Sequence, residues 1–211
     1  MAYSTNMAAA LSGATVSQLR HWRHDRTGPL LEPGIARSPA AYSFRDLVAL
    51  RTFVRMRETA SLQKIREAIG NLRTLGEVQH LGSYELVSGP GGQVQLVTAA
   101  EAMDLGKRKG QRLLLVAMGD VIEPFPVRAG VVVPHLLQPR ENLAVDPETQ
   151  GGTPVIAGTR VPYDAVAGLM RDGIAAERIA DYYPAVSAQG ARDALDFALY
   201  VDSYAPAPRA A

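Results

Sequence analysis

Apolar residues recur at helical spacing through the first third of the chain, beginning with Met7 and Leu11, which lie four residues apart. Ser4 or Thr5 can cap a helix that carries this pair. Gly13 can end the same helix, because glycine readily adopts the left-handed backbone that closes many helices. The pattern therefore predicts a short helix before residue 13.

A second helix is predicted directly after that glycine. Val16, Leu19 and Trp22 follow one another at intervals of three residues and define one buried face, so Trp22 is expected to pack in the core. Thr15 can cap this helix. The two short helices and the turn between them predict a helix-turn-helix unit. Polar and basic residues occupy the outward faces of the second helix: Gln18, Arg20, His21, Arg23 and His24.

The rest of the first segment, to residue 76, is predicted to contain a loop and two further helices. Residues 28–42 contain three prolines, which favour a short wing or loop over a helix. Ser43 can cap a third helix, and Ser61 can open a fourth, which Gly76 can close. The third helix carries an apolar stripe, with arginines on or near its edges: Leu47, Leu50 and Val54, with Arg45, Arg51, Arg55 and Arg57.

Short apolar runs between turn signals predict strands across residues 77–140. Two of the runs flank the sequence GPGG at Gly89–Gly92 and predict a hairpin, while Thr98 and Glu101 form a capping pair for a short helix. A two-residue turn at Gly119–Asp120 is expected to lead into a further strand. The predicted strands are Tyr84–Val87, Gln93–Val97, Arg112–Met118, Val121–Phe125 and Gly130–Pro134. We find no chemistry in this small α+β unit.

The last segment, residues 141–204, is predicted as a short extended arm followed by helices. Val155–Ile156 can form a short strand, and Gly158 can take a positive φ angle. The tail at residues 205–211 is expected to be loose. Three helical stretches follow the arm: Tyr163–Asp172, Ile174–Tyr183 and Ser187–Tyr204. The fold class is therefore expected to be mainly α with a small α+β middle, ending in a helix-turn-helix-like three-helix bundle.

Composition excludes several classes of protein. The 211 residues include no cysteine, which excludes a disulfide scaffold, a thiol nucleophile and a cysteine-ligated metal centre. No run approaches the roughly 18 apolar residues of a membrane helix. The first residues lack a basic leader with a long apolar core, so we expect no secretory signal. These features favour a cytoplasmic protein without membrane contact.

Support for catalysis or metal binding is weak. His21 and His24 are spaced like metal ligands on a helix, but Asp25 is their only near carboxylate. The acidic residues of the last segment lie at spacings typical of solvated helix faces: Asp181, Asp193 and Asp196. We therefore expect no enzyme, no metal site and no cofactor.

The near-neutral chain has a basic head and an acidic remainder. Residues 1–76 hold 11 Lys and Arg against 5 Asp and Glu, a net charge of +6, whereas residues 77–211 carry −5. Ten of the 11 basic residues are arginines, whose guanidinium groups suit bidentate contacts with phosphate and guanine. The head is therefore expected to meet a polyanion.

The first third resembles the winged helix-turn-helix of the MerR family in the stretches YSTNMAAALSGATVSQLRHW, PLLEP, YSFRDLVALRTFVRMRE and SLQKIREAI. The resemblance implies that Ser17–Trp22 is the recognition helix and that the wing ends near Tyr42–Ser43. His21 and Trp22 replace the tyrosine pair usual in that family. The long dimerisation helix of the family is not evident after Gly76.

This resemblance and the arginine excess together predict which residues contact DNA. The alternative interpretation is a solvated helix face, with arginines that only solubilise the chain or pair internally. Arginine and glutamine side chains match the edges of guanine and adenine in the major groove. The predicted DNA contacts are Ser17, Gln18, Arg20, His21 and Arg23 on the second helix, Arg37 in the wing and Arg45 on the third helix.

The most distinctive string is GGTPVIAGTRVP at Gly151–Pro162. It lacks the lysine of a phosphate-binding loop, so a structural role is favoured. With the helices after it, the string is similar to the domain of unknown function 433 family, which implies a compact helix-turn-helix-like bundle. Domains of that family occur in antitoxins partnered with PIN-like ribonucleases. Arg160 is the candidate partner-binding residue here, although an internal ion pair with Asp164 or another carboxylate is the favoured alternative, and Arg209 in the tail is a second candidate.

Together these features predict a VapB-type antitoxin with three parts: a MerR-like domain at 1–76, a connecting or dimerisation segment at 77–140 and an antitoxin-type domain at 141–204. It would bind a PIN-like ribonuclease toxin and, as a homodimer, double-stranded operator DNA. A first alternative is a MerR-like transcription regulator whose segment 77–140 binds a small-molecule effector. A second alternative is a purely structural interaction protein, which predicts no DNA binding.

Overall fold

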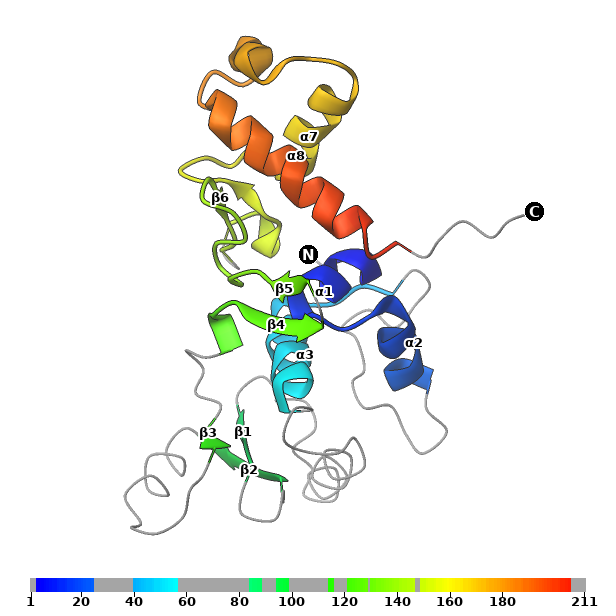
Figure 1. The fold of residues 1–211 in the computed structure, drawn as a ribbon. Coiled ribbons are helices and arrows are strands. Elements are labelled where there is room, and N and C mark those ends of the chain that lie inside the picture. The colour runs from blue at the N-terminus through cyan, green and yellow to red at the C-terminus, as the bar shows by residue number, and fades with distance from the viewer. Residues whose placement is uncertain are drawn as a thin grey trace, which may run out of the picture.

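The computed structural model describes residues 3–24, 40–56, 84–88, 94–98, 114–115, 121–128, 130–146 and 149–205. These residues form helices and small antiparallel sheets arranged along one long axis (Figure 1). The C-terminal helices form one end, the N-terminal helices lie in the middle, and the first sheet lies beyond them at the other end. The expected combination of helices with small antiparallel sheets is therefore confirmed for the described residues, about half of which are helical.

The first two helices form as the sequence predicts. Helix α1 (Thr5–Ser12) begins at Ser4, whose side chain accepts a hydrogen bond from the Met7 N–H, and ends at Gly13 with φ 81°. Helix α2 (Val16–His24) begins with a reciprocal pair: Thr15 Oγ1 accepts from the Gln18 N–H at 3.1 Å, and Gln18 Oε1 accepts from the Thr15 N–H at 2.7 Å. Local capping therefore fixes the turn between α1 and α2.

Helix α3 (Phe44–Met56) lies against α1 and closes the core of the N-terminal part. Its first turn has the same reciprocal cap, because Ser43 Oγ accepts from the Asp46 N–H and Asp46 Oδ2 accepts from the Ser43 N–H. Leu47 and Leu50 are buried, as the apolar stripe predicts. Most of the expected wing and all of the fourth helix lie outside the described residues.

Three small sheets accompany the helices, and all of their strands pair antiparallel. Strands β1 (Tyr84–Ser88) and β2 (Val94–Thr98) form the hairpin predicted around GPGG, with β3 (Leu114–Leu115) on the other edge of β1. The second sheet pairs β4 (Phe125–Arg128) with β5 (Val131–Val133), and the third pairs β6 (Leu143–Ala144) with β7 (Val155–Ile156).

The predicted strand Val121–Phe125 is wrong. Val121 and Ile122 are helical, and the strand begins only at Phe125. Pro124 has no N–H and disfavours helical backbone at the residue before it, so the helical turn ends there. The hairpin that the structure shows here pairs β4 with β5, with Arg128 opposite Val131, and the turn predicted at Gly119–Asp120 lies outside the described residues.

The C-terminal module, residues 141–204, is built around helices α7 (Tyr163–Arg171) and α8 (Ala188–Asp202). Tyr163 packs edge-on against Phe197, with 5.0 Å between the ring centroids, and Ser187 caps α8 as predicted. The stretch predicted as the middle helix forms only a 3₁₀ helix, η4 (Ala176–Asp181), and a further 3₁₀ turn, η3 (Gln150–Gly152), precedes β7.

The N-terminal helices and the C-terminal module share one continuous apolar core. Tyr200 on α8 donates to the carbonyl oxygen of Ala10 on α1 at 3.0 Å, and Tyr3 donates to the carbonyl oxygen of Gly152 at 2.7 Å. Burial raises the pKa of both tyrosines well above their ordinary value, so both hydroxyls remain donors. The C-terminal module is therefore fixed directly against α1 (Figure 1).

Candidate nucleic-acid interface

Helix α2 presents the predicted DNA-contacting residues on its solvent side. Its inward stripe is buried: Val16 is 8 % exposed, and Leu19 and Trp22 are each 2 % exposed. Core packing of Trp22 is thereby confirmed. The outward side chains follow from the helical period. Ser17, Arg20, His21 and His24 are exposed, and Gln18 and Arg23 are half-buried.

The polar side chains of this face differ in the hydrogen bonds and ion pairs that they form within the protein. Gln18 Oε1 is occupied by the Thr15 N–H, whereas its amide nitrogen has no hydrogen-bond partner among the described residues. The Nε of Arg23 donates to His24 Nε2 at 3.1 Å. Arg20 forms no ion pair with any described carboxylate, so its guanidinium is available to a ligand.

The other predicted site residues are not brought to this face by the described structure. Arg45 lies in the first turn of α3, but its side chain is outside the described part of the chain. Arg37 and Arg209 lie wholly outside the described residues. The predicted contacts that the structure places together are therefore those of α2.

A groove of about 410 Å³ separates α2 from the β4–β5 hairpin. Thr15, Gln18 and Trp22 line the helix side, and Val127 and Arg128 line the hairpin side. Gly13 and Val54 complete the described lining, none of which is acidic. Arg128 is not predictable from the sequence as part of this site, because only tertiary folding brings a residue more than 100 positions away beside α2.

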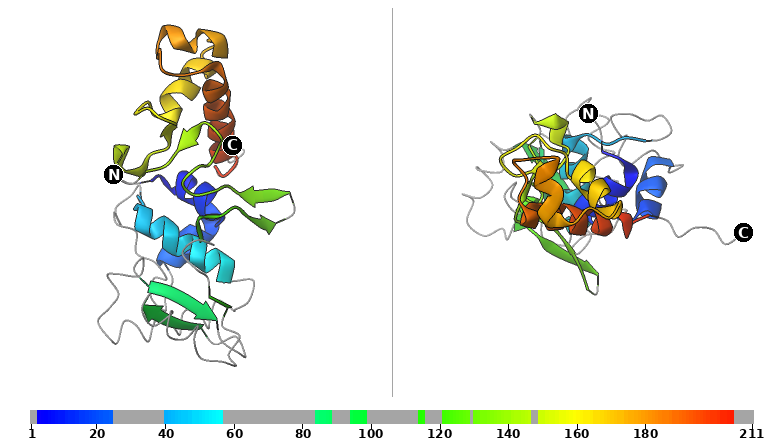
Figure 2. Two further views of the ribbon diagram at one scale, coloured as in Figure 1. Left: turned by 90° about the vertical axis from the view of Figure 1, so that its left-hand side faces the viewer. Right: turned by 90° about the horizontal axis from the view of Figure 1, so that it is seen from above.

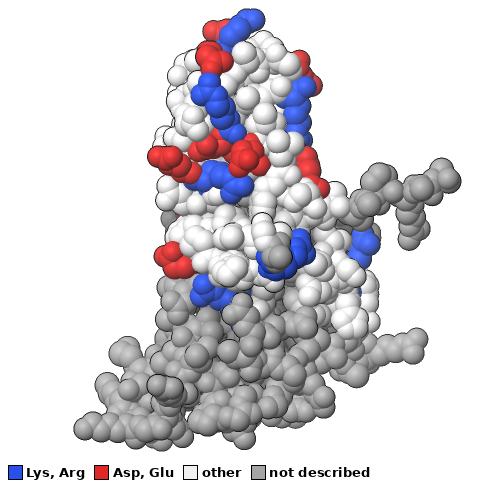
Figure 3. All heavy atoms as spheres, viewed as in Figure 1, with Lys and Arg blue, Asp and Glu red and all other residues white. Residues whose placement is uncertain are grey.

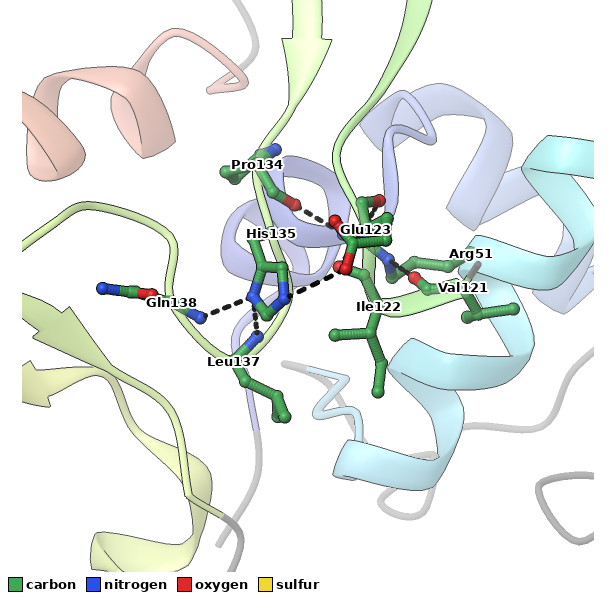
Figure 4. Close-up of polar contacts among 8 residues, drawn as sticks. All are labelled: Arg51, Val121, Ile122, Glu123, Pro134, His135, Leu137 and Gln138. Carbon is green, nitrogen blue, oxygen red and sulfur yellow. Dashed lines mark hydrogen bonds and ion pairs between the residues drawn. The ribbon is translucent and has the colours of Figure 1, made fainter. Parts of the chain in front are cut away.

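A buried arginine organises the segments around this groove. Arg51 on α3, which the sequence places on or near the edge of the apolar stripe, is fully buried. All five of its N–H groups donate to backbone carbonyls, and none of these acceptors is a carboxylate. Figure 4 draws four of the five acceptor residues, leaving out Leu11. Nη1 reaches Leu11 at 2.6 Å and Pro134 at 3.0 Å. The remaining acceptors follow in sequence, and they are the carbonyls of Val121, Ile122 and Glu123.

This arrangement joins three parts of the chain. Leu11 precedes the turn into α2, the carbonyls of residues 121–123 precede β4, and Pro134 follows β5. Burial, with Arg55 nearby, lowers the pKa of Arg51 to about 9, so the guanidinium stays protonated at neutral pH. Arg51 therefore clamps both ends of the hairpin to the end of α1.

Two neighbouring groups support the clamp. Arg55 lies over the Phe125 ring, with its guanidinium carbon 4.6 Å from the centroid. His135 Nδ1 accepts from the Leu137 and Gln138 N–H groups, which fixes the chain after β5 (Figure 4). The His135 Nε2 lies 3.8 Å from Glu123 Oε1, so the two strands' flanking segments also meet through their side chains.

Charged residues of the C-terminal module are mostly paired with one another. Arg140 pairs with Asp196, and Arg171 pairs with Asp202, each at 2.5 Å. Two more pairs lie on the same module, Arg178 with Asp181 and Arg192 with Glu177. Figure 3 shows these positive and negative side chains interspersed over the module.

Arg160 differs from those arginines. It is exposed and forms no ion pair with a described carboxylate, so the favoured internal pair is not formed there. Asp164, the proposed partner, accepts instead from the Ala165 N–H. The loop itself is held as the sequence predicts: Gly158 has φ 73°, and Thr159 bonds the backbone of Ile156 and Val161.

Neither a metal centre nor a membrane span is found in the described part of the chain. No group of three or more His, Cys, Asp or Glu side chains among these residues can hold a metal ion. None of the described helices combines the length and apolar character needed to cross a membrane.

Comparison with known proteins identifies the C-terminal module. Residues 143–198 match the family described as protein of unknown function (DUF433), which confirms the resemblance found in the sequence. An uncharacterized protein, y4eO, from Sinorhizobium fredii (strain NBRC 101917 / NGR234) is 36 % identical over 69 residues. That alignment covers 33 % of this chain and only 31 % of the relative's own length.

A solved structure shares the fold more widely. The X-ray crystal structure of Rv2018 from Mycobacterium tuberculosis superposes with a TM-score of 0.51 and covers 92 % of this chain and 97 % of that chain. The two sequences are 20 % identical. The similarity therefore shows a related overall fold and carries no statement about activity.

Proposed function

We propose that this protein is a DNA-binding antitoxin that neutralises a PIN-like ribonuclease and represses its own operon. The observation that carries the proposal is the outward face of α2, where Arg20, His21 and Arg23 stand over a buried apolar stripe. The major groove, about 12 Å wide, admits such a helix, and arginine donors match guanine edges. The proposal includes a MerR-like winged helix-turn-helix, whose wing falls mostly outside the described residues.

The DNA-binding half predicts sequence preference by a two-fold dimer. Two copies of α2 would meet half-sites about 34 Å apart, or a multiple of that distance. Fluorescence anisotropy with the duplex from upstream of the protein's own gene, against an unrelated duplex of equal length, tests this half. We expect tighter binding to the upstream duplex, with affinity falling steeply as salt increases. No binding to either duplex would overturn it.

The toxin-binding half rests on the family match of the C-terminal module and on Arg160, an exposed arginine that forms no ion pair with any described carboxylate. Co-expression with the product of the neighbouring gene, followed by copurification and a ribonuclease assay, tests it. We expect a stable complex with suppressed nuclease activity, weakened by Arg160→Ala. Arg178→Ala is the matched control, because its exposed ion pair with Asp181 contributes little to stability. A neighbouring product that is no nuclease, or that fails to copurify, would contradict this half.

The alternative is a MerR-like regulator that responds to a small molecule. Segment 77–140 contributes Val127 and Arg128 to the groove beside α2, whose volume lies within the range of ligand sites. This alternative predicts that a small-molecule extract of cells changes the DNA affinity of the purified protein. It also predicts that no nuclease copurifies, which separates it from the antitoxin.

A further inference from the structure

We propose that the β4–β5 hairpin is a second DNA-binding element. Its Arg128 contacts the DNA phosphate backbone beside the major groove that α2 enters. This inference rests on the proposed DNA binding by α2. It adds an element that lies outside the helix-turn-helix in sequence and consists of β4, residues 125–128, and β5, residues 131–133.

The hairpin has a fixed position relative to α2. A Cβ atom at Gly13 would lie 2.5 Å from Val133 Cγ2 and 2.7 Å from Val127 Cγ1, so both strands of the hairpin press directly on the turn between α1 and α2. Arg51 holds the segments before β4 and after β5 to the end of α1. A surface that binds α2 therefore meets the hairpin at a defined place.

The shape and chemistry of the hairpin suit a polyanion. It projects sideways from the body of the molecule as a two-stranded ribbon (Figure 2). Val132 on β5 is 55 % exposed, and Arg128 at the end of β4 is also exposed. None of the described residues that line the groove between the hairpin and α2 is acidic. The hydrogen-bond donors with which this lining can bind an anion include the Arg128 guanidinium and the Gln18 side-chain amide.

An aromatic ring positions the Arg128 side chain, and no described carboxylate neutralises its charge. Its guanidinium carbon lies 5.5 Å from the centroid of the Tyr204 ring, and Tyr204 is itself buried and hydrogen-bonded to Tyr200. No described carboxylate pairs with Arg128. An aromatic support restricts the side chain while leaving its N–H groups to bond a phosphate.

The test is a salt series of DNA affinities for the full chain and its variants. A phosphate contact adds about one unit to the slope of log affinity against log salt and acts on any sequence. We expect Arg128→Ala to weaken binding roughly tenfold and to lower the slope by about one, on the upstream duplex and on the unrelated duplex alike. Arg128→Lys keeps the charge and should keep the slope.

Two further variants separate this contact from general effects. Val132→Glu adds a negative charge on an exposed strand position, so we expect weaker DNA binding without loss of thermal stability. Arg178→Ala removes an exposed arginine of the C-terminal module and should leave DNA binding unchanged.

The outcomes distinguish the hairpin from α2. If the wild-type chain binds DNA and Arg20→Ala weakens it, but Arg128→Ala and Val132→Glu change neither affinity nor slope, the hairpin proposal is wrong and the proposed function stands. If Arg128→Ala instead abolishes copurification of the nuclease and spares DNA binding, the groove belongs to the protein partner. If the wild-type chain binds no DNA, the hairpin proposal and the DNA-binding half of the proposed function both fail.

Discussion

Arg51 is a charged side chain whose acceptors are all backbone carbonyls. A buried cation usually needs a carboxylate partner to offset the loss of hydration. Here five carbonyl oxygens supply the compensation, and each carbonyl itself gains a charged donor. The sequence could not predict this role, because an arginine between apolar residues on a helix looks the same whether its acceptors are water or carbonyls from residues 70 to 83 positions away.

Replacing Arg51 should therefore destabilise the chain far more than replacing an exposed arginine. We expect Arg51→Met to lower the free energy of unfolding by about 3–5 kcal/mol, because it leaves buried carbonyls without donors. Arg51→Lys should recover little, since an ammonium group has three donors and no planar fork. Urea denaturation measures both, with Arg20→Met as the exposed control, expected within about 0.5 kcal/mol of wild type. Equal free energies of unfolding for the Arg51 and Arg20 variants would contradict a stabilising role for the hydrogen bonds of Arg51.

At the scale of elements, the sequence predicts the helix caps and turns that depend on residues close to one another along the chain. The reciprocal caps at Thr15 and Ser43, and the positive φ at Gly158, depend on contacts within three residues. The predicted strand Val121–Phe125 is wrong, because Pro124 ends the helical turn before it and Arg51 from α3 binds the carbonyls of residues 121–123. For the same reason, the groove beside α2 could be found only in the structure, whereas the exposed face of α2 followed from its period.

The packing of the hairpin on the α1–α2 turn can be tested at two glycines. Gly13 (φ 81°) and Gly130 (φ 74°) both have positive φ angles, but only at Gly13 would a Cβ meet neighbouring atoms. Gly130→Ala should cost about 1–2 kcal/mol of unfolding free energy, the ordinary cost of a left-handed alanine. Gly13→Ala should cost a further 1–3 kcal/mol or so, from overpacking against Val127 and Val133. Thermal unfolding of the pair measures the difference, and equal costs would mean that the hairpin moves away freely.

At the scale of the whole molecule, the C-terminal module and the head behave as one packed unit. Tyr200 and Tyr3 each carry a long-range hydrogen bond across the boundary at residue 141. The sequence suggested three consecutive segments, and it contained no signal for their packing, because hydroxyl-to-carbonyl bonds leave no pattern along the chain. The module that matches a known family is thereby held close to the candidate DNA-binding helix.

The buried tyrosines of the folded chain predict a loss of stability at alkaline pH. Burial raises the pKa of Tyr3, Tyr163 and Tyr200 in the folded chain, so above pH 10 the unfolded chain releases protons that the folded chain retains. Unfolding is then favoured by up to about 1.4 kcal/mol per pH unit for each tyrosine. Arg51 acts in the opposite direction, because its pKa is lowered on folding. We therefore expect Tyr200→Phe to flatten the fall in urea midpoint between pH 10 and 11, and an unchanged fall would argue against its burial as a neutral donor.

The central claim is that the exposed face of α2 lies against duplex DNA, and Arg20 tests it most directly. The measurement is the affinity of the full chain for the duplex upstream of its own gene, across a salt series, with wild type and Arg20→Ala compared. We predict a roughly tenfold or greater loss for Arg20→Ala at low salt, with unchanged thermal stability, because Arg20 is exposed and unpaired among the described residues. Equal DNA affinity of the two proteins at every salt concentration would contradict the claim.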